Sequence, residues 1–415
     1  MGFDIALSGI QAINQQLDTI SHNIANAGTY GFKSSRANFS SLYAGSTPTG
    51  TEVSSLTQSI GQNGGTVATG RGLDASINGR GFFVSKDNQG QSVYSRVGIF
   101  AKDVDGYLTN GAGQRVQGYT QKPPSTQLGT LGDLPIPTGQ IPAVATTKGS
   151  FSLNVSRDWK TPVNAATFDP TDWKSFNMSK SMVLHDSLGG ERVLTQYFIK
   201  DDTVPDAITV KYLLDGVADA AGAPDTVLTF DPTTGQLASV APPPASALAN
   251  SVALKLTPAG GGAIGDAVDG LVTLDYTGTT NFYGEATTAI NAADGYASGS
   301  YVGVELNEKG AMIAKYTNGQ KQSVGVLAIA SFPDEGALTN ISDTSWTANA
   351  QSGTPLYDTP GVGMAGALNV ARLEQSNVDI TSELVGLMTS QRNYQANSKV
   401  IQTQSAMMQS LMQAL

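Results

Sequence analysis

The stretch SHNIANAGTYGFKSSRANF, residues 21–39, decides the fold, because a helical pattern ends inside it. Up to Asn26 the apolar residues recur with a helical period, and the two glycines of AGTYGFK then stop the helix. Between Asp18 and Lys33 the only side chain that can be charged near neutral pH is His22. The polar face of this N-terminal helix is therefore built from Ser, His and Asn, whereas a solvated helix normally carries Glu and Lys there.

Heptad repeats of apolar residues mark a helix at each end of the chain. They predict an N-terminal helix of about 25 residues with a coiled-coil seam. The C-terminal helix is expected to start at a cap formed by Ser376 or Asn377, with Asp379 in its first turn. After Lys399 no side chain is charged. The predicted seam residues are Phe3, Ile10, Ile13, Leu17, Ile20, Ile24, Leu384, Leu387, Tyr394, Ile401, Met408, Leu411 and Leu415.

Two terminal helices with matched seams are expected to pair with each other. Pairing alone does not explain their uncharged outer faces. In a polymer of identical subunits a charge on that face would meet its own copies, and burying it would be costly. We therefore expect the helix pair to pack against further copies of itself. The alternative is an ordinary two-helix coiled coil that happens to be polar.

Composition excludes several classes of function. Charged residues make up 14% of the 415 residues, and the net charge is −10. Residues 151–296 contain 17 acidic and 8 basic residues, and no basic stripe typical of nucleic-acid binding exists. Cysteine is absent, which excludes disulfides and thiolate metal sites. No stretch reads as a cleaved signal peptide or is apolar enough to enter a membrane.

Between the helices the chain reads as short strands and turns, so the expected fold class is mainly β with paired terminal helices. Hairpin turns are predicted at Asn78-Gly79, Asp105-Gly106, Asn110-Gly111 and Asn318-Gly319. The pattern of short alternating strands and turns seen before about residue 148 returns near residue 297, which indicates that one domain is inserted into another. The predicted domains are 1–30 with 373–415 (terminal helices), 31–70 (a connector that orders on assembly), 71–148 with 297–372 (middle β domain) and 149–296 (outer inserted β domain).

No catalytic, cofactor or metal site is indicated. Gly361-Val-Gly363-Met-Ala-Gly366 matches G-x-G-x-x-G but lacks the strand and helix that a dinucleotide site needs, so a turn is expected. Asp103-Val-Asp105-Gly106 is expected to be a hairpin turn rather than a calcium loop. His185 and Asp186 are expected to form a solvated turn pair. We therefore predict that the protein is not an enzyme.

Both ends resemble the bacterial flagellar rod and hook protein family. The N-terminal segment SHNIANAGTYGFK is similar to the family's N-terminal signature, and SNVDITSELVGLMTSQRNYQANSKV is similar to its closing helix. The segments INGRGFF and YTNGQ resemble its inner β domain. The motif residues carried over are Asn23, Asn26, Thr29, Gly31, Phe32, Asn377, Asp379, Gln391 and Arg392.

The long insertion between the β flanks resembles hook rather than rod members. The resemblance implies a structural subunit that self-assembles into a curved hollow tube, a flexible joint that transmits torque from rod to filament. It implies an extracellular place in the flagellar basal body and hook, reached by type III export without a cleaved signal peptide. Phe39-Ser-Ser-Leu-Tyr43 is similar to a short export-gate signal of the family. The implied partners are copies of itself, the distal rod protein, the hook cap, the hook–filament junction protein and the type III export gate.

Two alternatives remain open from the sequence. Within the family, the chain could be a distal-rod or other hook-like axial protein. From a different class, an exported adhesin or tail-type β protein would share the composition. Such a protein would have no reason to divide its coiled coil between the two termini.

Overall fold

A computed structural model describes residues 2–44, 47–122, 127–200, 204–217, 225–242, 250–342 and 344–414. The described chain is mainly β, with helix α1 (Gly2–Ala25) at one end and helix α2 (Ile380–Ala414) at the other. This confirms the predicted fold class. The chain divides into two compact units: Met1–Thr138, Val302–Lys315 and Lys321–Leu415 form the first, and Gly139–Tyr301 with Tyr316–Gln320 form the second.

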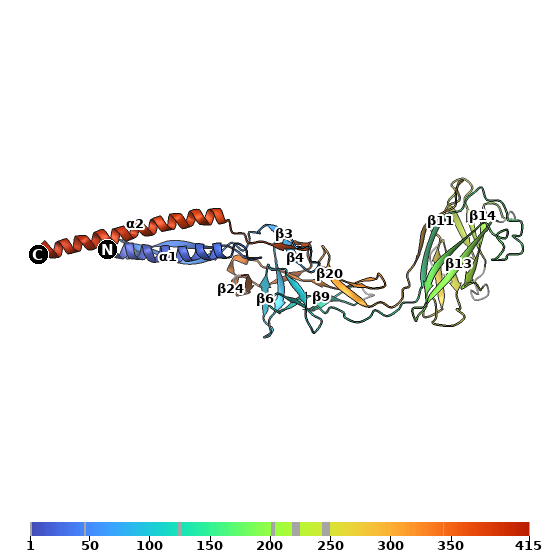
Figure 1. Cartoon of the computed structure of the whole chain (residues 1–415), viewed down its shortest axis with the longest axis horizontal. Helices are drawn as coiled ribbons and strands as arrows, with labels where there is room; N and C mark the ends of the chain where they lie inside the picture. Colours follow the sequence, from blue (N-terminus) through green and yellow to red (C-terminus); the bar gives the residue numbers. More distant parts are fainter. Residues whose placement is uncertain are drawn as a thin grey trace. The chain divides into compact units, whose positions relative to one another are not determined.

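Helices α1 and α2 lie side by side and run antiparallel (Figure 1). The register follows from close contacts: Gly9 lies opposite Asn397, and Ile20 lies opposite Gly386. Asn23, one turn further along, bonds to Glu383. α1 contains 24 residues, so its predicted length and its pairing with the C-terminal helix are confirmed.

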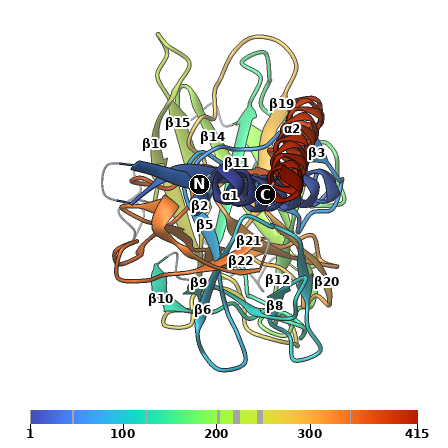
Figure 2. The same cartoon turned by 90° about the vertical axis from the view of Figure 1, so that its left-hand side faces the viewer.

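The predicted connector contains an ordered β-hairpin. Strands β1 (Ser35–Ala44) and β2 (Thr47–Gln58) pair antiparallel, with Phe39 opposite Val53. The hairpin packs on α1, where the amide of Thr51 donates to the hydroxyl of Ser8 over 3.2 Å. Figure 2 shows the hairpin beside the helix pair. The subunit's own helix thus supplies a packing surface for the hairpin, and the expectation that residues 31–70 order on assembly stays a prediction.

The β part of the first unit is built around one large sheet. Its strand order is β20 (Tyr301–Leu306), β21 (Ala311–Tyr316), β22 (Lys321–Leu327), β9 (Arg115–Gln121), β5 (Phe82–Lys86), β6 (Ser92–Ser95), β25 (Ser345–Thr347) and β24 (Thr339–Ser342). Branching strands are β7 (Phe100–Lys102), β8 (Leu108–Asn110), β10 (Leu128–Asp133), β23 (Ile329–Ser331) and β26 (Leu356–Asp358). The core is aromatic, and the rings of Phe82 and Trp346 meet edge to face with centroids 5.6 Å apart.

Two small sheets and a short helix complete this unit. Strand β3 (Thr66–Ala68) pairs with β28 (Arg372–Glu374), and β4 (Ala75–Asn78) pairs with β27 (Ala367–Val370). The 3₁₀ helix η2 (Glu335–Ala337) follows β23. Both small sheets join a segment that follows α1 to a segment that precedes α2, so they close the connection between the helices and the larger sheet.

Three of the four predicted Gly-containing turns form hairpins. Asp105-Gly106 joins β7 to β8, Asn110-Gly111 joins β8 to β9, and Asn318-Gly319 joins β21 to β22. The hairpin predicted at Asn78-Gly79 is wrong. β4 ends at Asn78 and pairs with β27, while the next strand, β5, pairs with β6, β9 and β23.

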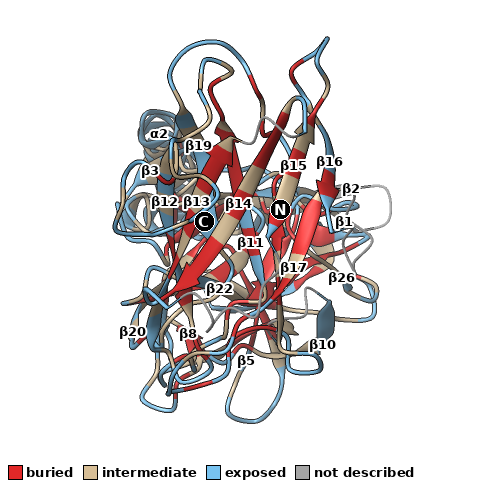
Figure 3. Cartoon of the chain, turned by 90° about the vertical axis from the view of Figure 1, so that its right-hand side faces the viewer, coloured by how far each residue is buried: buried red, intermediate tan, exposed pale blue. Residues whose placement is uncertain are grey.

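The second unit is a β-sandwich. One sheet has the order β17 (Ser251–Lys255), β18 (Leu271–Asp275), β11 (Lys148–Asn154) and β19 (Thr287–Ala293). The other has the order β12 (Met178–His185), β13 (Glu191–Lys200), β14 (Ala207–Leu214), β15 (Thr226–Phe230) and β16 (Leu237–Ala241). Alternate residues of both sheets are buried in one core, where Phe151 stacks on Phe198 at 6.0 Å (Figure 3).

The segment Gly361–Gly366 is a turn between β26 and β27. The amide of Gly361 donates to the carbonyl of Gly366 over 3.1 Å, and strands flank the turn on both sides. The strand–turn–helix setting of a dinucleotide site is therefore missing at this motif, as predicted.

Candidate functional site

The helix pair is the first part of the candidate site. Along α1, one predicted seam row is buried against α2 and its surroundings, with Ile13 and Ile20 each 7% exposed. The other row, containing Ile10, Leu17 and Ile24, is only half-buried, and Phe3 is 48% exposed. The subunit alone therefore covers about one row of the predicted seam.

Small residues let the helices approach closely. Ala6 and Ala12 are buried, and a Cβ atom placed on Gly9 would lie 2.9 Å from Nδ2 of Asn397. That distance is shorter than a normal contact, so this position of α1 has no room for a side chain while Asn397 keeps its place. The contact is specific to this register.

α2 is longer than α1 and extends beyond its first residue. Continuing the antiparallel register places Gly2 opposite Gln404, so residues 405–414 have no α1 residue opposite them. Met408 and Leu411 in this extension are 65% and 55% exposed. Further back, Leu384 and Tyr394 are also exposed, whereas Leu387 and Ile401 are half-buried. Leu415 lies outside the described residues.

The second part of the site is the junction between the helices and the β strands. Asn23 is 1% exposed and makes three hydrogen bonds. Its Nδ2 donates to the carbonyl of Ser35 at 2.8 Å and to Oε1 of Glu383 at 2.9 Å, and its Oδ1 accepts from the amide of Ser35 at 2.9 Å. A single side chain thus joins α1, β1 and α2.

Other motif residues shape the turn that follows α1. Thr29 donates its hydroxyl to Oδ1 of Asn26 over 3.1 Å, and Nδ2 of Asn26 donates to the carbonyl of His22. Gly31 has a φ of 70°, a conformation that favours glycine, and its amide donates to the carbonyl of Glu374. Phe32 is fully buried, with its ring 5.5 Å from that of His22.

The segment that leads into α2 uses its motif residues differently from the prediction. Asn377 does not cap the helix. Its Oδ1 accepts from the amide of Ser34 at 2.7 Å, and its Nδ2 donates to the carbonyls of Ser59 and Gln62. Asp379 is the cap, because its Oδ1 accepts from the amide of Thr381 at 2.9 Å. Hydrogen bonds from Ser382 and Thr381 hold the pKa of Asp379 below its ordinary value.

A buried ionic cluster lies at the same junction. Nζ of Lys33 is 2.6 Å from Oε1 of Glu374, and Nη1 of Arg96 is 3.5 Å from Oε2, with all three side chains at most 1% exposed. Burial lowers the pKa of Lys33 and of Arg96 below their ordinary values, against the opposing charge of Glu374. Sequence reasoning missed Glu374. No local pattern indicates it, since its partners lie hundreds of residues away along the chain.

The remaining predicted residues lie on open surfaces. Gln391 and Arg392 are exposed on α2. Phe39 and Tyr43, the predicted export signal, are 45% and 64% exposed on β1. Both pairs are therefore accessible in the subunit.

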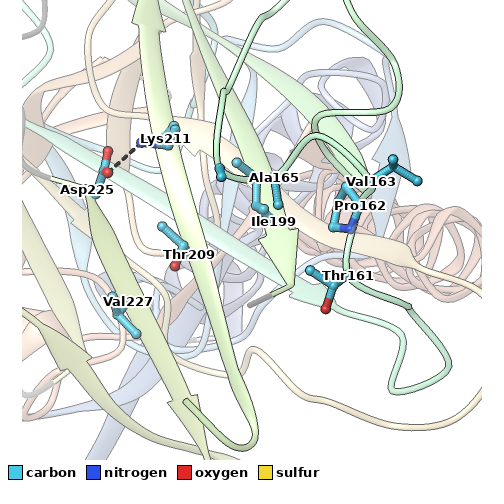
Figure 4. A pocket seen from close by; sticks show the side chains of 10 residues that line it. Thr161, Pro162, Val163, Ala165, Ile199, Thr209, Lys211, Asp225 and Val227 are labelled. Carbon is cyan, nitrogen blue, oxygen red and sulfur yellow. Dashed lines mark hydrogen bonds and ion pairs between the residues drawn. The ribbon is translucent and has the colours of Figure 1, made fainter. Parts of the chain in front are cut away.

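The second unit offers no catalytic arrangement among its described residues. A groove of this unit lies between residues 161–166 and strands β13–β15, with the Lys211–Asp225 ion pair (2.5 Å) on its wall (Figure 4). The expected solvated pair His185–Asp186 is wrong. Asp186 is 2% exposed and accepts from the amides of Leu188, Gly190 and Gly262, because it organises the turn after β12.

Two further features of the described residues concern metal ligands and membrane spans. Across the described ranges, histidine, aspartate and glutamate side chains do not gather in groups of three or more suited to a metal ion. Among the helices of the described residues, none has the length and hydropathy needed to cross a membrane.

Family models cover both ends and the middle of the chain. Residues 3–33 match "Flagella basal body rod protein", and residues 371–414 match "Flagellar basal body rod FlgEFG protein C-terminal". Residues 76–161 match "Flagellar hook protein FlgE/F/G D1 domain", and residues 153–296 match "Flagellar basal body protein FlaE D2 domain".

Full-length relatives agree with these matches. The chain is 34% identical to flagellar hook protein FlgE of Escherichia coli K12 over 422 residues, which covers 99% of both chains. It is 33% identical to the FlgE of Salmonella typhimurium over 419 residues, again with 99% of both covered. The crystal structure of Helicobacter pylori flagellar hook protein FlgE2 shares the fold, with a TM-score of 0.52 at 13% identity over 73% of this chain and 99% of that one.

The resemblance predicted from the terminal motifs is therefore confirmed along nearly the whole length. The hook relatives match through the long insertion as well as at the two ends. The chain belongs to the flagellar hook protein FlgE family, as a structural, non-enzymatic hook subunit.

Proposed function

We propose that the subunits polymerise through their terminal helices into a curved hollow tube that acts as a flexible joint between rod and filament. Family membership carries self-assembly within the flagellar axial structure, outside the cell. The observation that supports the helical contact is the uncovered end of α2. Its residues 405–414 have no α1 residue opposite them, and Met408 and Leu411 stand exposed there.

Copies of the chain are the best occupant of this surface. The exposed apolar side chains of α2 alternate with Gln, Ser and Thr, and no charge follows Lys399. Apolar side chains gain by leaving water, and uncharged polar side chains can be buried with hydrogen bonds at modest cost. In a tube, identical faces meet repeatedly, so the lack of charge avoids repeated repulsion between copies.

The outer part of the chain is proposed to form the periphery of the tube. We assign residues 1–30 with 373–415 to the inner wall, 71–148 with 297–372 to a middle β domain, and 149–296 to an outer inserted domain. The acidic excess of the last segment supports this assignment, since 17 acidic and 8 basic residues in 151–296 suit hydrated contacts that slide as the tube bends.

The export route and the further partners are proposals that rest on the family resemblance. We propose export through the type III apparatus, with Phe39 and Tyr43 read by the export gate while the chain is extended. The exposure of both side chains supports their accessibility. The distal rod protein, the hook cap and the hook–filament junction protein are the partners expected at the ends of the tube.

A charge placed in the predicted seam tests the helical contact. Leu17→Lys and Ile401→Asp each put a charge at a half-buried position on the helix pair. A charge left unpaired in an interface costs several kcal/mol. We expect both variants to remain soluble at concentrations where the unchanged protein sediments as polymer, with unchanged β-sheet circular dichroism.

The matched control is Asn88→Asp, which adds a charge at an exposed turn between β5 and β6. This variant should polymerise as the unchanged protein does. Normal polymer from Leu17→Lys and Ile401→Asp would show that the seam residues are not an interface between subunits.

A further inference from the structure

One buried carboxylate ties together the segments that connect the helix pair to the β sheet. Oε1 of Glu374 accepts from Nζ of Lys33 at 2.6 Å and from the amide of Gly64 at 3.1 Å. Oε2 accepts from Nη1 of Arg96 at 3.5 Å. The carbonyl of Glu374 also accepts from the amide of Gly31 at 2.9 Å.

These groups come from four segments that meet at the junction. Lys33 lies between α1 and β1, and Gly64 lies between β2 and β3. Glu374 ends β28, six residues before α2 begins at Ile380. Arg96 belongs to the β part, following β6 in the large sheet. The carboxylate therefore links the connections of α1, the hairpin and α2 to one point of the sheet.

Burial and additional contacts hold the side chains of the cluster in place. Lys33, Arg96 and Glu374 are each at most 1% exposed, so salt in the solvent screens their attraction little. Nζ of Lys33 makes a second bond, to the carbonyl of Gln62 at 2.5 Å, and the guanidinium of Arg96 lies 5.2 Å from the ring of Phe82 in the aromatic core. Removing the carboxylate would leave two buried cations facing each other.

We propose that Glu374 is a positioning residue that fixes the hairpin and the bases of both helices on the β sheet. In a hook, this keeps the angle between the helix pair and the β sheet fixed. Force applied to the helices is then transmitted to the β domain without bending at the junction. Bending then has to be taken up elsewhere in the subunit. The proposal rests on the proposed function only for its mechanical consequence, because the rigid junction itself can be measured in the dissociated subunit.

Pulsed electron paramagnetic resonance provides the test. The chain contains no cysteine, so Ser41→Cys and Asn88→Cys supply the only two labelling sites in the full-length subunit. Both positions are exposed, one in β1 and one in the turn between β5 and β6. Ser41 lies toward the far end of the hairpin, so a small rotation at the junction becomes a large change in the label distance.

We expect a narrow distance distribution for the labelled subunit and at least a twofold broadening after Glu374→Gln. Glu374→Asp, which keeps the charge, should restore part of the narrow distribution. The matched control is Asp186→Asn. Asp186 is also buried and paired, with Nη2 of Arg192 at 3.4 Å, but it lies in the second unit, which carries neither label. Its loss should leave the width unchanged.

The proposal would be overturned by a broad distribution in the labelled subunit itself, by an unchanged width after Glu374→Gln, or by equal broadening after Asp186→Asn. If Glu374→Gln loses its near-ultraviolet circular dichroism, Lys33→Met replaces it. That variant leaves Glu374 paired with Arg96 and removes the link to the α1 side, so it should broaden the distribution and would contradict the proposal if it did not. A failure of tube formation alone would concern the proposed function and leave this measurement intact.

Discussion

Replacing Asn23 with alanine should weaken assembly about a hundredfold. Asn23 is 1% exposed and joins α1, β1 and α2 through three hydrogen bonds of 2.8 to 2.9 Å. Each buried bond of this kind contributes about 1 kcal/mol, so the loss amounts to about 3 kcal/mol. Assembly requires the helix pair in the geometry that these bonds set, so their loss reduces the free energy gained in the assembly step. A factor of ten corresponds to about 1.4 kcal/mol, which gives a rise of about two orders of magnitude in critical concentration.

The assay is sedimentation of polymer over a series of protein concentrations, with the supernatant concentration read at the plateau. The matched control is Asn38→Ala in β1, where the exposed amide bonds to the hydroxyls of Ser55 and Thr57. Exposed substitutions of this type change stability by less than about 0.5 kcal/mol, so the control should shift the critical concentration less than about threefold. A shift below threefold for Asn23→Ala would contradict this prediction, because the junction bonds would then contribute nothing measurable to assembly.

Three further predictions concern the helices, the outer unit and acid stability. In the dissociated subunit, amide hydrogen exchange should show no protection over residues 405–414, which have no α1 residue opposite them, since an isolated helical segment is marginal in water; strong protection there would contradict the ordering of this segment on assembly. Replacing residues 149–296 with a short Gly/Ser linker should still give tubes, but with altered or absent curvature in electron micrographs, and a folded variant that forms no tubes would place this segment in the assembly core. Burial alone would raise the pKa of Asp186, but bonds from the amides of Gly190, Gly262 and Leu188 and from Arg192 outweigh it and hold the pKa below its ordinary value. The contribution of Asp186 to stability is therefore present above its unfolded pKa, near 4, and is lost as the pH falls through its folded pKa. The calorimetric melting temperature of the second unit should drop in acid, and Asp186→Asn should reduce that drop.

The terminal helices were predictable because their information is local. The recurrence of apolar residues every seven positions marks both helices, and the two glycines after Asn26 end the first one. The Asp-Gly and Asn-Gly turns between paired neighbours were predictable for the same reason. Asn78-Gly79 has the same local signal, but β4 pairs with β27, about 290 residues later, so local turn chemistry does not decide its role.

The junction was not predictable, because its contacts join segments that are far apart in the sequence. The connector 31–70 has no strong apolar alternation, and its hairpin depends on the surface that α1 provides. Asn377 carries a good capping side chain, yet three carbonyl and amide groups of the connector occupy it, and Asp379 caps α2 instead. The family motif that contains Asn377 could be located from the sequence. The role of Asn377 follows only from its hydrogen bonds to the backbone of Ser34, Ser59 and Gln62.

Electron microscopy of the purified protein, concentrated under assembly conditions, shows whether the subunits polymerise into a hook-like tube. If the terminal helices build the wall of a hook, the micrographs should show hollow tubes with a defined curvature. Straight rods would contradict the flexible-joint function and favour a rod-like axial role. Dispersed subunits at every concentration would contradict self-assembly through the helix pair.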